Sequence, residues 1–208
     1  MSKNLSFMKH LIFLIALTFS ITSVLYSQSE VENYLKLLQN KFDSIESLSV
    51  EFVQLKNDNP NMSGSLYLKK ENNIKIVTND FTVTSNGKTA WNYNKSENKV
   101  IISNVDENDP EVFSLNKIVY EFPKECEVSF SSDGEMRTIT LLSKGYTYNF
   151  NKIVLQLNDD DLISKVKISD PSLGETVVTF SDYVLNLNLP DSEFTFIPPE
   201  GTKIIDLR

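Results

Sequence analysis

Residues 31–54 read VENYLKLLQNKFDSIESLSVEFVQ, and a change of hydrophobic period within them decides the fold. Up to residue 45 the apolar side chains recur every three or four positions, which is typical of an amphipathic helix. From Leu48 they alternate with polar ones, as in a half-buried strand. The chain is therefore expected to pass from a helix at 31–46 into a sheet. The helical apolar positions are Val31, Tyr34, Leu35, Leu38, Phe42 and Ile45.

Turn signals recur after this point, and they separate short runs rich in β-branched and aromatic residues. Such a pattern predicts a meander of antiparallel strands rather than βαβ units. The predicted strands after the first are residues 65–68, 74–78, 81–85, 89–93, 100–103, 138–142, 153–157, 166–169 and 177–181. Residues 109–120 interrupt the meander with helical character, since Asp109 can cap a helix and Pro110 suits its first turn.

The expected fold class is mainly β (α+β), with about ten or eleven strands in an antiparallel sheet that can curl into a partial barrel. An N-terminal helix and a short helical lid are thin cover for so wide a sheet. If they lie across its mouth, they enclose a hydrophobic cavity suited to an apolar ligand. The alternative is an interior packed shut by its own side chains.

The first 27 residues resemble a secretory signal peptide. Lys3 and Lys9 precede an apolar run at 11–24, and Ser27 is a small residue at the expected cut. The run is short for a membrane span, although a retained anchor is the alternative. Residues 28–208 are expected to form a single exported, soluble domain without a lipid-modified cysteine.

Composition excludes several kinds of chemistry. The chain has 28 acidic and 20 basic side chains, a net charge of −8, which disfavours nucleic acid and anionic lipid. Its one histidine, His10, lies in the predicted signal peptide, so Ser-His-Asp and Cys-His catalysis lack a base. The one cysteine, Cys126, permits no internal disulfide and suits a buried strand position. We expect no cofactor and no metal, because the acidic runs at 106–109 and 158–161 lack the spacing of a calcium loop.

Several stretches resemble the LolA family of periplasmic lipoprotein carriers, in the family's order. Residues 47–54 are similar to its first strand and residues 64–70 to its second. Residues 85–94, SNGKTAWNYN, resemble its Asp-Gly-Lys-x-Leu-Trp hairpin. Asp170 to Gly174 matches its Asp-x-x-Gly turn, and residues 194–201, FTFIPPEG, its closing signature. The resemblance spans most of residues 30–205.

The resemblance implies a half-barrel with a helical lid that binds the acyl chains of lipoproteins. Such a carrier is loaded by an inner-membrane ABC transporter, delivers to the outer membrane with or without an acceptor there, and catalyses no reaction. A periplasmic monomer is expected. The alternatives are a related half-barrel that carries free lipid or glycolipid or senses lipoprotein in envelope-stress signalling, and, from another class, a secreted hydrolase that uses two carboxylates.

Strand parity and the resemblance together nominate the site residues. The predicted lid comprises Val112, Phe113, Leu115, Ile118 and Val119, with Leu35 and Leu38 from the first helix. The predicted cavity lining is Val50, Phe52, Leu66, Leu68, Ile74 and Ile76, with Trp91 and Tyr93 at the rim on the same parity; an ordinary core is the alternative for each of them.

Two departures from the family pattern affect this site. Lys70-Glu71 stands where the family has Arg-Pro, and the family's arginine is thought to hold the lid shut. Lys70 is therefore the candidate latch, although a solvated surface lysine is the alternative, because an ammonium lacks the forked donors of a guanidinium. Ile74 and Ile76 stand where the family often has Phe and Trp, which implies a cavity of different shape.

Overall fold

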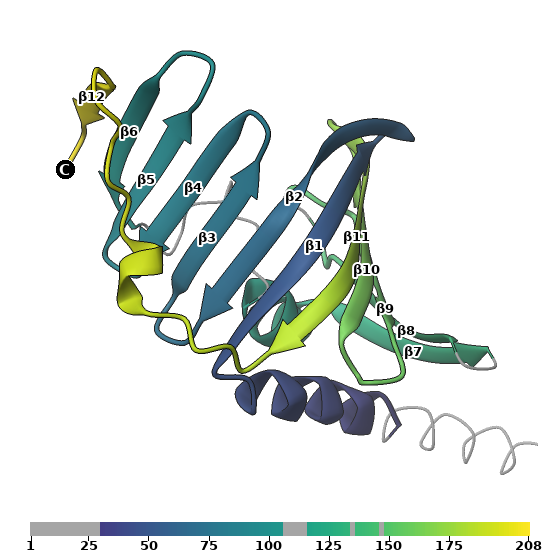
Figure 1. The fold of residues 1–208 in the computed structure, drawn as a ribbon. Coiled ribbons are helices and arrows are strands. Elements are labelled where there is room, and N and C mark those ends of the chain that lie inside the picture. The colour runs from purple at the N-terminus through teal and green to yellow at the C-terminus, as the bar shows by residue number, and fades with distance from the viewer. Residues whose placement is uncertain (1–29, 106–115, 134–135, 146–147) are drawn as a thin grey trace, which may run out of the picture.

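One open sheet makes up most of the computed structural model, which describes residues 30–105, 116–133, 136–145 and 148–208. Its 12 strands run in the order β12-β6-β5-β4-β3-β2-β1-β11-β10-β9-β8-β7, so β12 and β7 are its edges (Figure 1). Neighbouring strands are antiparallel except for β12, which pairs in parallel with β6. The strands are β1 Ser47–Lys56, β2 Asn59–Lys69, β3 Asn73–Thr78, β4 Phe81–Asn86, β5 Thr89–Asn94, β6 Lys99–Asn104, β7 Glu127–Asp133, β8 Met136–Leu142, β9 Lys152–Leu157, β10 Ile163–Asp170, β11 Gly174–Leu185 and β12 Lys203–Asp206.

The predicted mainly β half-barrel is confirmed, with differences in detail. Strands β7 and β12 are additional to those that the sequence pattern predicts. Each is an edge strand; β7 carries only two apolar residues, Val128 and Phe130, and β12 has only four residues. Short or polar edge strands give a weak hydrophobic signal because one side of each lacks a partner strand.

The helical segments agree with the sequence in place and differ in type. Residues 30–43 form the N-terminal helix, and β1 follows at Ser47. The described part of the predicted lid begins with a π-helix, η1, at Lys117–Glu121, followed by α2 at Phe122–Glu125. A 3₁₀ turn, η2, spans Asp191–Phe194. Residues 106–115, which include the predicted lid residues Val112, Phe113 and Leu115, lie outside the described residues.

The tight turns at two hairpins each place two consecutive residues in left-handed backbone. Asn57 and Asp58, between β1 and β2, have φ of 48° and 63°. Glu71 and Asn72, between β2 and β3, have φ of 67° and 59°. Two consecutive positive φ values are the requirement of the hairpin turns whose twist matches that of the flanking strands. These turns therefore help to set the register of β1, β2 and β3.

Register assigns each residue of the first six strands to one of two faces. Val50 lies opposite Leu66, Leu66 opposite Ile76, and Ile76 opposite Val83, so these four residues share what we call the inner face. The next residue along each strand points to the opposite side of the sheet, which we call the outer face; Lys75, Thr84 and Trp91 form one such row. In Figure 1 the N-terminal helix lies along one end of the sheet, and η1 and α2 lie behind the sheet.

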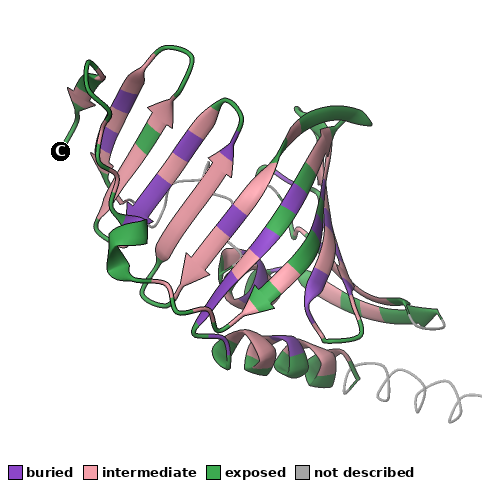
Figure 2. Ribbon diagram, viewed as in Figure 1, coloured by how far each residue is buried: buried purple, intermediate pink, exposed green. Residues whose placement is uncertain are grey.

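The molecule has a separate apolar core on each face. The inner core is one continuous cluster built on β1, β2 and β8–β11, with Leu38 of the N-terminal helix and Ile118 and Val119 of η1. The outer core lies over β4 and β6, and its buried residues are Thr82, Thr84, Val100, Ile102 and Phe194. Figure 2 shows buried bands alternating with more exposed ones along β1.

The outer core is covered by a C-terminal strap, which we define as residues 186–200. It crosses β3–β5 on the side of the sheet opposite to η1 and α2 (Figure 1). The side chain of Phe194 is fully buried, and η2 contacts β3 and β4. Lys69 Nζ pairs with Asp191 at 2.5 Å, and Lys75 Nζ with Glu193 at 2.7 Å. The sheet is therefore roofed on both faces, over different strands.

Candidate functional site

Six of the eight predicted lining residues lie together on the inner face. Val50 faces Leu66, which faces Ile76, and the parallel row joins Leu48, Leu68 and Ile74. Val50, Phe52 and Leu66 are buried, with exposed fractions of 1%, 8% and 6%. Leu68, Ile74 and Ile76 are only partly buried and pack against the border of the inner core. The inner face is thus apolar across three strands, and its exposure increases toward β3.

Trp91 and Tyr93 do not join this group, contrary to the expectation from parity. Trp91 pairs with Thr84, and Tyr93 with Thr82, whereas the row of Ile76 and Val83 continues to Asn92. Both aromatic side chains therefore lie on the outer face. The ring of Tyr93 packs against Phe196 of the C-terminal strap, with centroids 5.0 Å apart. The two aromatic residues belong to the attachment of the strap rather than to a rim of the interior.

The described lid residues roof the inner face. Ile118 and Val119 are 3% and 0% exposed, and Leu38 from the N-terminal helix is 0% exposed. Leu35 is partly buried and packs against the same cluster. We call residues 117–125, which contain η1 and α2, the roof segment. The two helical regions that the sequence nominated therefore meet over the same apolar surface.

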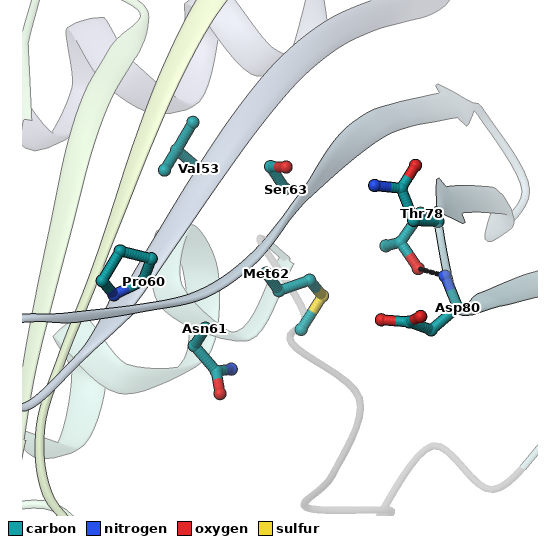
Figure 3. Close-up of a pocket in the computed structure, with 8 residues that line it drawn as sticks. Val53, Pro60, Asn61, Met62, Ser63, Thr78 and Asp80 are labelled. Carbon is teal, nitrogen blue, oxygen red and sulfur yellow. Dashed lines mark hydrogen bonds between the residues drawn. The ribbon is translucent and has the colours of Figure 1, made fainter.

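The interior next to β1 is filled by the chain's own side chains. Val50, Phe52, Leu66, Leu38, Ile118 and Val119 belong to one packed cluster. Among the described residues they do not line the enclosed cavity that the sequence predicted. Two of the hollows that the described residues outline have volumes of about 250 and 450 Å³, and both are open to the surface and mixed in polarity. The smaller one lies where β2 begins and β3 turns into β4, beside Met62, Thr78 and Asp80 (Figure 3). Neither hollow has the enclosed apolar walls that an acyl chain requires.

Lys70, the candidate lid latch, contacts Glu46 in the structure. Its ammonium pairs with the carboxylate of Glu46, and its backbone N–H donates to the Glu46 carbonyl at 3.0 Å. Glu46 lies between the N-terminal helix and β1. Both side chains are largely exposed, at 48% and 70%, so the ion pair adds little to stability. In the described structure Lys70 contacts the residue before β1, chiefly through its backbone hydrogen bond.

A different set of contacts joins the roof segment to the N-terminal helix. The Tyr120 hydroxyl donates to Asp43 Oδ1 at 2.6 Å, and Gln39 Nε2 donates to the carbonyl oxygen of Val119 at 3.1 Å. Burial, followed by the hydrogen bond to Asp43, raises the pKa of Tyr120. The tyrosine therefore stays protonated and remains a donor at any physiological pH.

The second half of the roof segment is joined to the sheet. Phe122 lies 4.8 Å from Tyr148 and 5.0 Å from Phe150 between ring centroids. The Tyr148 hydroxyl donates to Glu125 Oε2 at 2.7 Å. Burial and this hydrogen bond raise the pKa of Tyr148 to about 12. Cys126, which follows, is buried at 4% exposure, and burial raises the pKa of its thiol.

The sequence-based site residues did not include the second wall of the interior, which is formed by β8–β11. Alternation within β8, β9 and β10 was a usable signal, but only the pairing of β11 with β1 places these strands beside the predicted lining. Val83 was also missed, although it lies directly opposite Ile76. The buried residues of this wall are Ile139, Leu141, Ile153, Leu155, Leu157, Ile163, Val166, Val178 and Phe180.

The inner face offers hydrophobic contact and little else. Among the residues that the structure describes, no group of three or more His, Cys, Asp or Glu side chains is placed to hold a metal ion. No described helix is both long and apolar enough to cross a bilayer. The chain therefore belongs to the class of open half-barrels whose apolar inner face is roofed by short helical segments.

Comparison with known proteins identifies the family within this class. The family described as "Outer membrane lipoprotein carrier protein LolA" matches residues 43–197, and the chain belongs to it. The outer-membrane lipoprotein carrier protein of Francisella philomiragia is 26% identical over 96% of this chain and 98% of its own length. That of Francisella tularensis subsp. novicida is 25% identical over 81% of this chain and 86% of its own.

A solved structure supports the fold independently of close sequence similarity. An uncharacterized conserved protein from Thermus thermophilus superposes with a TM-score of 0.57. The match covers 82% of this chain and 98% of that one at 10% sequence identity. At that identity the likeness concerns the fold alone.

Proposed function

We propose that this chain is a periplasmic carrier that holds the acyl chains of lipoproteins and moves them from the inner to the outer membrane. The observation that supports this most directly is the apolar inner face, which is continuous across β8–β11 and β1–β3 and is roofed by two helical segments rather than by a second sheet. Membership of the LolA family and the names of the Francisella relatives support the same function.

The packed interior is compatible with a carrier if the ligand replaces the roof. Burial is worth about 0.8 kcal/mol per methylene, so one long acyl chain contributes on the order of 10 kcal/mol to a site that excludes water. The side chains of Leu38, Ile118 and Val119 occupy the apolar space in the described structure. Acyl burial would offset their displacement, and their return would help to release the cargo. An exchange of this kind avoids exposing an empty apolar cavity to water.

The remaining parts of the proposal concern location and partners. Residues 1–27 would direct export and be removed, which leaves residues 28–208 as a monomeric periplasmic domain. An inner-membrane ABC transporter would load the carrier, and the outer membrane, with or without an acceptor protein, would receive the cargo. The cycle consists of binding and release, without a covalent step.

Binding of a fluorescent triacylated lipopeptide to the exported protein tests the site. Ile76→Glu places a carboxylate on the inner face, and we expect at least about tenfold weaker binding because the charge would be desolvated beside the acyl chain. Val77→Glu is the matched control, since Val77 is the next residue of β3 and lies on the outer face. Thermal melts would verify that both variants fold. Equal binding by the two variants would place the site elsewhere.

Depletion of the protein in cells that depend on it tests delivery. Outer-membrane lipoproteins are expected to accumulate at the inner membrane, and normal sorting would contradict the proposal. Native mass spectrometry of the protein from the periplasm provides a second readout. Triacylated peptide as the bound species supports the lipoprotein carrier, whereas free phospholipid or glycolipid supports the related free-lipid carrier.

A further inference from the structure

The two halves of the roof segment are attached to different parts of the molecule, the first to the N-terminal helix and the second to the sheet. The first half, η1, is joined by polar contacts to the N-terminal helix, through Tyr120 to Asp43 and through Val119 to Gln39. All of these groups are at least partly accessible to solvent, except Val119, whose side chain is buried. Polar contacts of this kind add little net stability, because water competes for the same donors and acceptors. The polar part of this attachment is therefore weak, and the burial of Ile118 and Val119 in the inner core supplies the rest.

The second half, α2, is attached to the sheet by aromatic packing. Phe122, Tyr148 and Phe150 form a three-ring cluster, in which Tyr148 and Phe150 stack at 5.1 Å with an interplanar angle of 10°. Phe150 is 8% exposed, and the Tyr148 hydroxyl holds Glu125 at the end of α2. The chain continues through buried Cys126 directly into β7. This end is fixed to the wall of the half-barrel.

The junction between the halves has an unusual backbone. Residues 117–121 form a π-helix, and the backbone N–H of Phe122 donates to the carbonyl of Lys117. Pro123 follows at the start of α2 and has no N–H to donate. π-helical turns are rare, and they occur frequently at functional sites. Proline also disfavours helical geometry at the residue before it, so the helical backbone of Phe122 (φ −58°, ψ −37°) is held by its packing rather than by local preference.

We propose that the roof segment is a flap that pivots at Phe122–Pro123 and is held shut by a clasp, defined as Tyr120, Asp43 and Gln39. When the clasp opens, η1 turns away from the N-terminal helix and takes Ile118 and Val119 out of the inner core, while α2 stays on the aromatic cluster. The clasp thereby controls how fast acyl chains enter. This inference rests on the proposed function and assigns the control of access to residues other than Lys70.

The chain provides a matched pair of variants for a test. Tyr120→Phe removes the hydroxyl of the clasp, and Tyr148→Phe removes a hydroxyl from the attachment of α2 to the sheet, where it also donates to a carboxylate. In hydrogen exchange of the exported protein without lipopeptide, we expect Tyr120→Phe to speed exchange of residues 117–121 about fivefold. Association with the fluorescent lipopeptide should accelerate by a similar factor. Tyr148→Phe should leave the association rate within about twofold.

Substitutions of Asp43 separate a loss of the clasp from a general loosening. Asp43→Asn keeps an oxygen acceptor for Tyr120 and is expected to behave like the wild type, whereas Asp43→Ala should reproduce Tyr120→Phe. Unchanged exchange of residues 117–121 in Tyr120→Phe would refute the clasp. Equal acceleration by Tyr120→Phe and Tyr148→Phe would refute the hinge. If no variant and no wild-type protein binds lipopeptide, the proposed function fails, while the exchange data still decide the clasp.

Discussion

At Gly64 the backbone of β2 passes so close to β3 that no side chain fits. A Cβ atom there would lie 2.0 Å from the carbonyl oxygen of Val77, which is part of the β2–β3 ladder. Because a backbone atom cannot rotate away, the two strands would have to separate. Glycine is thus required by packing at this position, since its φ is not in the left-handed region.

Gly64→Ala should therefore destabilise the fold by about 2 kcal/mol, a typical magnitude for overpacking. Urea unfolding of the purified protein measures this. Gly145→Ala is the control, because its Cβ would meet nothing within 4 Å, although the residue has φ of 77°. The control should lose only about 1 kcal/mol from backbone strain. Equal losses would show that the contact with Val77 relaxes.

Single residues also show where sequence reasoning stopped. Parity within one strand correctly grouped Leu66 with Leu68 and Ile74 with Ile76. Parity cannot link one strand to the next without the register, and for this reason Trp91 and Tyr93 were placed on the wrong face. The register depends on turns and on cross-strand partners, such as Val83 opposite Ile76, which a one-dimensional pattern does not contain.

Among the elements, the C-terminal strap has the clearest energetic role. Phe194 of η2 is 0% exposed and lies over β3 and β4, whereas the inner core does not include it. The strap also contributes backbone contacts, since the Ser47 hydroxyl donates to the Leu187 carbonyl at 2.6 Å. The family resemblance identified residues 194–201 as a signature, but their role as an anchor on the outer face required the three-dimensional structure.

Phe194→Ala is expected to cost about 3–5 kcal/mol, the usual range for a buried phenylalanine. Ile197→Ala is the control, because Ile197 is 84% exposed and should change stability by less than about 0.5 kcal/mol. Hydrogen exchange should show the loss of protection in β3–β6 before β8–β11, because the strap covers only the former. Uniform loss of protection would mean that the two cores unfold as one unit.

At the scale of the whole molecule, the sequence predicted the class of fold and left its closure open. A meander of short strands follows from turns and alternation, and the resemblance supplied the half-barrel. The pairing of β1 with β11 joins residues about 130 positions apart, as in Phe52 with Phe180. This pairing places β8–β11 beside β1–β3. The local pattern does not specify it, because hydrophobic strands of similar composition are compatible with several strand orders.

The same long-range packing determines how the protein responds to pH. Burial raises the pKa values of Tyr120, Tyr148 and Tyr183, and these residues join the N-terminal helix, roof and sheet into one structure. Tyr183 donates to the Ile163 carbonyl at 2.6 Å, next to the inner core. All three pKa values are higher in the folded chain than the usual 10 for an exposed phenol. The folded state therefore binds their protons more tightly than the unfolded state does.

The stabilisation that accompanies these shifts should be complete below about pH 10 and should decrease as the pH rises further, because the unfolded phenols ionise first. For Tyr148, with a pKa of about 12, the loss falls between pH 10 and 12. Thermal melts at pH 8, 10 and 11 should show the melting temperature falling only above pH 10. In Tyr148→Phe the melting temperature should start lower at pH 8 and fall less between pH 10 and 11, because one of the three linked protons is gone. A variant whose alkaline decrease equals that of the wild type would show that Tyr148 does not contribute.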